Sequence, residues 1–213
     1  HNWPKEIPSL NHRYDPDFYV VSLGTNDAQP LKTKTSWIRT DNPKWPIRYG
    51  DRVDKMLDLM AGKDRRRMIV WLGPTAFRAK NSRELGPTLH KVIKERIEAF
   101  DGNAIYIDAY HATSPRRGRY IKTVKVPDQR KQEPAWASDN IHLSTHAVRW
   151  LLAEPVLRLL ADCLDQPEPE LRRGIDDSIA RATRRRSLDD GTTTPTHPTP
   201  PAPAEGDGAT PPG

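Results

Sequence analysis

The stretch Phe18-Tyr19-Val20-Val21-Ser22-Leu23-Gly24-Thr25-Asn26-Asp27 decides the fold class of this 213-residue chain. Five of its first six residues are aromatic or aliphatic, and Gly24 and Asn26 end the run, which is typical of a buried strand that opens into a loop. Ligands of open α/β sheets bind at the loops beyond the carboxyl ends of the strands. The alternative is a plain turn, because Gly, Asn and Asp favour turns in any protein.

Two further apolar runs predict strands at 68–72 and 104–108. Apolar residues at helical spacing predict two amphipathic helices. One, at 49–61, lies between the first and second strands, and the other, at 85–100, lies between the second and third. A strand–helix–strand–helix–strand order with short links predicts an α/β fold with a parallel sheet and right-handed crossovers.

The ends of this region are less regular. Residues 1–16 are polar and interrupted by proline, so we expect no long helix there and at most a turn at 7–10. Residues 28–48 predict a long loop with two tryptophans, either a lid or a cover for the sheet edge. A last helix is predicted at 145–164, with Pro155 kinking or dividing it and Val148 and Cys163 on its buried face.

A second informative stretch is Ser138-Asp139-Asn140-Ile141-His142-Leu143. An Asp and a His three residues apart, just before a helix, can place a carboxylate against an imidazole nitrogen. The carboxylate then fixes the tautomer and supports the imidazolium that forms when the ring takes a proton. The alternative is an Asp that caps the turn beside a solvent-exposed His.

Together the two stretches resemble the SGNH (GDSL-type) hydrolases, in which a G-x-N-D block supplies an oxyanion-hole Asn and a D-x-x-H block supplies the Asp and His of a triad. The flanks resemble a bacterial, envelope-associated branch of that superfamily. The resemblance covers about residues 14–164 and implies a flavodoxin-like three-layer α/β/α fold. The residues on which the resemblance rests are Gly24-Thr25-Asn26-Asp27-Ala28-Gln29, Trp37, Tyr49, Arg52-Val53 and Val70-Trp71-Leu72-Gly73.

The resemblance also implies a role for each site residue. His142 is the general base, Asp139 orients it, and Asn26 donates its side-chain amide to the oxyanion. Gly24 lets the backbone turn closely, and Asp27 braces the loop.

The sequence departs from the family in one respect. The family's nucleophile is a Ser in a G-D-S block on its first strand, and its second block carries a Gly, yet neither block precedes Gly24. We expect that the first strands are absent from this sequence, which leaves 18–23 at an open edge of the sheet and the chain inactive by itself. The alternative is a member that lacks the nucleophile.

Other polar residues are weaker candidates. His111 follows the third strand without a partner at a recognisable spacing, and His90 lies off the apolar stripe of its helix, so we expect it to be solvated. His146 lies one turn beyond His142, but no third ligand is near in sequence, so we expect neither a metal nor a cofactor. Ser114 and Ser144 lack the context of a nucleophile.

Charge and composition bear on partners. Residues 1–164 carry a net charge of +9, and a basic loop at 116–131 predicts contact with an anionic polymer, or is simply a solvated loop. No nucleic-acid recognition motif accompanies this charge. Cys163 is the only cysteine, so no disulfide within the chain is predicted.

The predicted domain organisation has three parts. Residues 1–164 form the partial hydrolase-like domain, 165–190 a charged linker or short helix, and 191–213 a disordered tail rich in Pro, Thr, Ala and Gly. Two function hypotheses remain open. One is an SGNH-type esterase or acyltransferase acting on an ester or an O-acylated envelope glycan. The other is a non-catalytic envelope scaffold that kept the fold. Both imply an envelope or secreted location, with an anchor, if any, outside this sequence.

Overall fold

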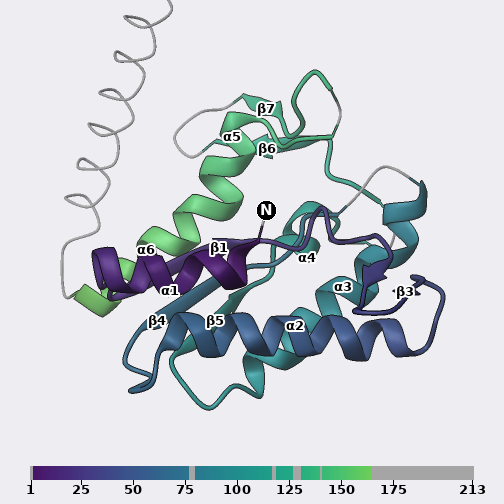
Figure 1. Ribbon diagram of the computed structural model, residues 1–213. Helices are drawn as coiled ribbons and strands as arrows, with labels where there is room; N and C mark the ends of the chain where they lie inside the picture. Colours follow the sequence, from purple (N-terminus) through teal and green to yellow (C-terminus); the bar gives the residue numbers. More distant parts are fainter. Residues whose placement is uncertain (1, 77–79, 117–118, 127–130, 140, 165–213) are drawn as a thin grey trace, which may run out of the picture. The chain divides into compact units, whose positions relative to one another are not determined.

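Three parallel strands form the sheet at the centre of the computed structural model (Figure 1). They are β1 (Phe18–Ser22), β4 (Met68–Leu72) and β5 (Ala104–Ile107), in the order β1-β4-β5. Val20 lies opposite Val70, and Val70 lies opposite Ile105. The α/β class and the parallel sheet are therefore confirmed, with each strand within one residue of its predicted bounds.

The structure describes residues 2–76, 80–116, 119–126, 131–139 and 141–164, and only the backbone of residues 80–83 and 164. The predicted linker at 165–190 and the predicted tail at 191–213 lie outside this part of the chain.

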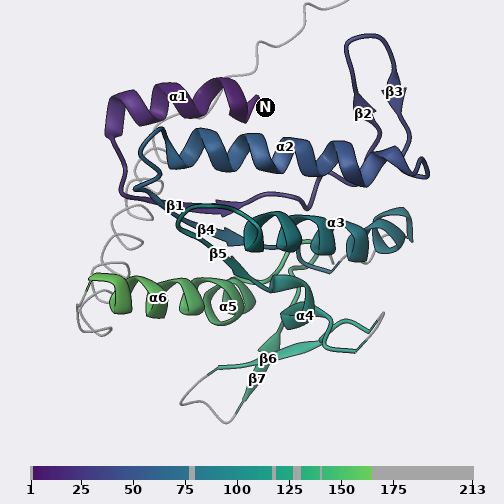
Figure 2. The same cartoon turned by 90° about the horizontal axis from the view of Figure 1, so that it is seen from below.

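Helices cover both faces of the sheet (Figure 2). Helices α2 (Lys44–Ala61) and α3 (Lys80–Glu98) pack on one face, and α6 (Glu154–Leu164) packs on the other. The central strand β4 is buried on both sides because its side chains alternate: Ile69 and Trp71 face α2 and α3, whereas Val70 and Leu72 face α6. Burial on both faces explains why this strand reads as a continuous apolar run.

A helix, α1 (Trp3–Tyr14), occupies the amino-terminal region, where we expected at most one turn. Pro4 is in the first turn of the helix, where a backbone N–H would have no partner within the helix, so the missing N–H of proline costs no hydrogen bond. Pro8 is tolerated inside the helix. The helix packs on α2 through Ile7, and Asn11 donates a hydrogen bond to the carbonyl of Leu59. Tertiary packing thus overrides the local signal of the prolines.

The predicted long loop after β1 contains two short strands, β2 (Leu31–Lys32) and β3 (Trp37–Ile38), which pair as an antiparallel ribbon. Trp45 lies in the first turn of α2, which begins at Lys44, five residues before the predicted start of that helix at 49. It is fully buried, stacks on Tyr49 and donates its indole N–H to the carbonyl of Gln29. Of the two tryptophans, Trp45 is a core residue, whereas Trp37 is exposed.

The last helical region is continuous but not regular. It runs through α5 (Thr145–Ala147), a π-helical segment η1 (Val148–Ala153) and α6. Pro155 clashes with the carbonyl of the preceding turn in a regular α-helix, and the wider π turns just before it relieve this contact.

The π segment changes which side chains are buried. Leu157 and Ala161, which were not predicted on the buried face, are buried. Val148 and Cys163, which we placed on the buried face from a strict 3.6-residue period, are exposed. That prediction is wrong for these two residues.

Along the chain, α4 (Ala109–Thr113) and a hairpin formed by β6 (Thr123–Lys125) and β7 (Gln132–Pro134) come between β5 and the last helical region. Helix α4 follows directly from β5, and its Thr113 hydroxyl accepts a hydrogen bond from the amide of Ala76, after β4. The loops that follow β4 and β5 are therefore joined at the carboxyl edge of the sheet.

Strand β1 pairs only with β4 among the described residues and so lies at an edge of the sheet, as expected. The side chain of Val20, in the middle of this apolar strand, is 51% exposed at that edge.

We predict that Gly24→Ala destabilises the fold by about 1–3 kcal/mol. Gly24 has a φ of +120°, and a Cβ placed on it would lie 2.9 Å from Cδ1 of Ile93 in α3. Chemical denaturation measures the loss. The control is Ser22→Ala, an exposed site two residues earlier, which we expect to change the free energy of unfolding by less than about 0.5 kcal/mol. Equal stability of the two variants would contradict the assigned strain.

Candidate functional site

The loop Gly24–Asp27 follows β1 at the carboxyl edge of the sheet. The amide of Asp27 donates to the carbonyl of Gly24 at 3.0 Å, which closes a tight turn. The hydroxyl of Tyr49, on α2, donates to Oδ2 of Asp27 at 2.8 Å, and burial raises the pKa of Tyr49 far above its ordinary value. Tyr49 therefore holds the loop as a neutral donor. Asn26 is exposed at the tip of the loop.

A cleft of about 690 Å³ adjoins this loop on the side of α2. Asp27, Tyr49, Arg52 and Trp71 are among its lining residues. Asn26, Asp139 and His142 are not, so the cleft is separate from the residues that the sequence singled out for catalysis.

Asp139 and His142 form the pair that the spacing predicts. Oδ2 of Asp139 lies 2.6 Å from Nδ1 of His142, and Oδ1 accepts hydrogen bonds from the amides of Ile141 and His142. The carboxylate therefore holds the proton on Nδ1 and leaves Nε2 as the acceptor. The His142 side chain is 79% exposed and that of Asp139 is 44% exposed.

The hydrogen bond from the His142 ring is the main cause that lowers the pKa of Asp139 to about 2, helped by the two amide bonds. The carboxylate therefore stays ionised near neutral pH, as a base-orienting group requires.

Short-range contacts shape this loop. The amide of Ala137 donates to the carbonyl of His142, and the amide of Ser144 donates to the carbonyl of Ala135, which closes the loop at its base. Ser144 then caps α5, because its Oγ accepts from the amide of Ala147. The same Oγ donates to the carbonyl of Pro134 at 2.6 Å.

A second Asp-x-x-His pair, Asp108 and His111, lies at the end of β5. Oδ2 of Asp108 lies 2.7 Å from Nδ1 of His111, and Oδ1 accepts the His111 amide at 2.9 Å. This geometry nearly repeats that of Asp139 and His142. The sequence analysis found no partner for His111, although the three-residue spacing that revealed the other pair was present here too.

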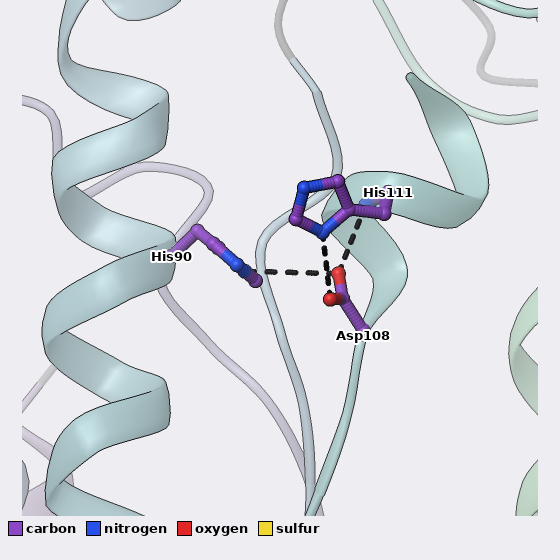
Figure 3. Close-up of side chains that lie close together, drawn as sticks. All are labelled: His90, Asp108 and His111. Carbon is purple, nitrogen blue, oxygen red and sulfur yellow. Dashed lines mark hydrogen bonds and ion pairs between the residues drawn. The ribbon is translucent and has the colours of Figure 1, made fainter. Parts of the chain in front are cut away.

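His90 joins this second pair, so the prediction that it is solvated is wrong. Its side chain is only 12% exposed, and its Nδ1 lies 3.7 Å from Oδ1 of Asp108 and 2.8 Å from the hydroxyl of Tyr106. Figure 3 shows His90 of α3, Asp108 at the start of α4 and His111 of α4 pointing toward one another. The helical pattern places His90 outside the apolar stripe of α3, but Tyr106 of β5 and Asp108, just after that strand, cover this side of the helix.

Burial lowers the pKa of His90, an effect opposed by Asp108 and reinforced by His111 and Lys94. Burial alone would raise the pKa of Asp108, but the hydrogen bonds from the amide and ring of His111 bring it below its ordinary value. A neutral His90 thus faces an ionised carboxylate.

Gly73 makes this cluster feasible. A Cβ on Gly73 would lie 2.0 Å from the hydroxyl oxygen of Tyr106, so only glycine lets the Tyr106 ring cross the end of β4. That crossing brings the hydroxyl to His90.

The predicted site residues fall into two groups, and among the described residues we find no hydrogen bond or ion pair between the two. Gly24, Asn26 and Asp27 follow β1, whereas Asp139 and His142 lie between β7 and α5. Ser114 is buried, and its Oγ donates to the carbonyls of Arg116 and Arg119. Like Ser144, it has a structural role.

His146, which we weighed as a metal partner of His142, is exposed. Within the described part of the chain, the one set of three side chains placed to hold a metal ion is instead His90, Asp108 and His111, whose ligand atoms lie within 4.8 Å of one another.

The fold and the two Asp–His pairs define an α/β protein with imidazole–carboxylate pairs in the loops after its strands. The chain belongs to the family described as "Protein of unknown function (DUF459)", which matches residues 1–158. No match to a curated protein was found. Among the described residues, no helix combines the length and the apolar character needed to span a bilayer.

We predict that the carboxyl group of Asp139 titrates with a pKa of about 2, and that His142→Ala moves this pKa up toward its ordinary value of 3.8. Because folding depresses this pKa, its contribution to stability is present above 3.8 and is lost as the pH falls toward 2. Carboxyl-carbon NMR measures both values. His111→Ala serves as the control, since it removes the equivalent ring from Asp108 and leaves Asp139 untouched. If the pKa of Asp139 is unchanged in the His142→Ala variant, the assigned hydrogen bond is wrong.

Proposed function

We propose that this chain contributes the acid–base part of an SGNH-type serine ester hydrolase. The observation that carries the proposal is the geometry of Asp139 and His142: the carboxylate holds Nδ1 at 2.6 Å, so the lone pair of Nε2 points away from it as a general base. The family of unknown function to which the chain belongs leaves the activity open.

In this reaction, Nε2 of His142 takes the proton of a serine hydroxyl as its oxygen attacks the ester carbonyl. Asp139 stabilises the imidazolium that results, and the side-chain amide of Asn26 donates to the oxyanion. A donor of this kind lowers the barrier by about 3 kcal/mol. The tetrahedral intermediate then expels the alcohol, which takes the proton from His142. Water attacks the acyl-serine in the same way, with His142 again as base.

The nucleophile belongs, in this proposal, to a strand that pairs with the free side of β1, next to the Gly24–Asp27 loop. The parallel order β1-β4-β5 supports it, because the flavodoxin-like arrangement places the nucleophile strand beside β1. The exposure of the apolar side chain of Val20 on β1 agrees with such a neighbour. The structural bonds of Ser114 and Ser144 argue against a nucleophile among those two residues.

We propose an O-acylated glycan of the cell envelope as the substrate class. The resemblance to the envelope-associated branch supports the location, and exposed cations near the site support an anionic polymer. Arg116, Arg119, Lys122, Lys125 and Lys131 are exposed in the part of the predicted basic loop that the structure describes. Arg117 and Arg130 lie outside that part.

We predict that His142→Ala in the complete gene product lowers kcat for a p-nitrophenyl acyl ester by at least about three orders of magnitude, because only binding and the oxyanion hole remain. Steady-state kinetics measure the effect. The matched control is His146→Ala, an exposed histidine one helical turn away, which we expect to retain kcat within about twofold.

Asp139→Asn keeps the shape of the pair but no longer stabilises the imidazolium, so kcat falls by up to about 10⁴-fold. Near-normal turnover of the His142→Ala variant would eliminate the proposed base.

We predict that neutralising Arg116, Arg117 and Arg119 together raises KM for an anionic acylated glycan and weakens its dependence on salt, while KM for a neutral ester stays the same. Kinetics at about 20 and 200 mM salt separate the two effects, since screening acts only on the charged substrate. The control replaces Arg48, Arg39 and Lys34, which are exposed on other parts of the surface. An unchanged salt response in the first variant would exclude the anionic contact.

A further inference from the structure

Three side chains from two segments far apart in the sequence converge just beyond the carboxyl end of β5 (Figure 3). His90 comes from the middle of α3, Asp108 follows β5 as the N-cap of α4, and His111 lies on α4. One ligand atom of each lies within 4.8 Å of the others. We propose that His90, Asp108 and His111 form a binding site for a divalent transition-metal ion, with Zn²⁺ as the best match.

The donor set selects the ion. Two imidazole nitrogens and one carboxylate oxygen are borderline ligands that suit Zn²⁺, whereas Ca²⁺ and Mg²⁺ prefer sites made of oxygen alone. Zinc sites with three protein ligands of these types keep a fourth position for water or substrate. The single carboxylate leaves one net positive charge on the ion, so the fourth position favours an anion or a polarised oxygen.

The surroundings hold the ligands in place. The Asp108 carboxylate accepts both the amide and the ring nitrogen of His111, so these two ligands form one preassembled pair. The Tyr106 hydroxyl fixes the ring of His90, which also packs near the Tyr110 ring at 5.2 Å between centroids. Outer contacts of this kind orient metal-binding histidines.

Binding needs a small contraction. Tetrahedral zinc bonds of about 2.0–2.1 Å put ligand atoms about 3.3 Å apart, which is closer than the present spread of up to 4.8 Å. The His111 side chain is 60% exposed and sits on a helix of five residues, so it can move. His90 and Asp108 are more buried and supply the fixed part of the site.

The Asp139–His142 pair provides an internal comparison. It has the same spacing and nearly the same hydrogen bonds, but within the described residues no third ligand accompanies it. A metal that merely recognises an Asp-x-x-His turn would bind both pairs, whereas the proposed site requires His90. The inference does not depend on the proposed hydrolase activity.

The test is calorimetric titration of Zn²⁺ into the complete gene product after removal of metals with a chelator, with Co²⁺ absorption as a second readout of nitrogen and oxygen coordination. We expect one ion per chain at micromolar or lower concentration. His90→Gln and His111→Gln should each weaken binding by more than the roughly 10–100-fold that loss of an outer partner costs, and Tyr106→Phe should fall within that range.

The control His142→Gln removes a ring with the same partner geometry and should bind Zn²⁺ like the unaltered protein. Circular dichroism checks that each variant is folded, and Asp108→Asn replaces His90→Gln if the buried substitution prevents folding. Absence of Zn²⁺ binding at 1:1 stoichiometry, equal binding by the unaltered protein and His111→Gln, or loss of binding in His142→Gln would overturn the proposal. None of these outcomes bears on the esterase kinetics of the His142→Ala variant.

Discussion

The parallel pairing of β1, β4 and β5 is the constraint on which the rest of the structure depends. It makes all three strands end at one edge, and each end leaves a different feature there: the Gly24–Asp27 loop, Gly73 and Asp108. Because β4 lies between the other two strands, the residue after its last position must leave room for side chains of its neighbours, and Gly73, which has no side chain, does so. The Tyr106 ring crosses over that glycine to reach His90. A side chain at position 73 would therefore disturb residues that are distant in sequence, from α3 to α4.

The Asp-x-x-His spacing occurs twice in the described part of the chain, and both times the Asp and the His of the motif form a hydrogen bond. In each case the Asp oxygen accepts an amide of the following turn, which fixes the carboxylate, and the ring then closes on the other oxygen. The local sequence is sufficient for this bond, because both partners lie within one turn. It does not determine what the pair does. Asp139 and His142 face solvent, whereas Asp108 and His111 meet His90, which comes from another layer of the structure.

This difference explains what the sequence predicted and what it missed. The strands and the helices α2 and α3 follow from apolar patterns, which report burial directly. The helix α1 was missed because the two prolines are local breakers, whereas packing of Ile7 and the bond from Asn11 to Leu59 are tertiary. The exposure of Cys163 was missed because the regular 3.6-residue period on which the prediction rests is interrupted by a π segment upstream of Cys163. His90 was misplaced because a helical stripe says nothing about a strand end that covers the opposite side.

Solvent exposure sets a physical condition on the proposed chemistry. A carboxylate and an imidazole in water attract each other weakly, because a high dielectric screens their charges, and an oxyanion donor there competes with water. With its side chain 79% exposed, His142 has the right tautomer but not yet the dry surroundings in which such a base is most effective. In the proposed reaction, a bound substrate that covers His142 provides those surroundings. The side chain of His90, by contrast, is only 12% exposed. The two Asp–His pairs of this chain therefore differ in their surroundings: Asp139 and His142 are open to water, whereas Asp108 and His111 adjoin the buried ring of His90.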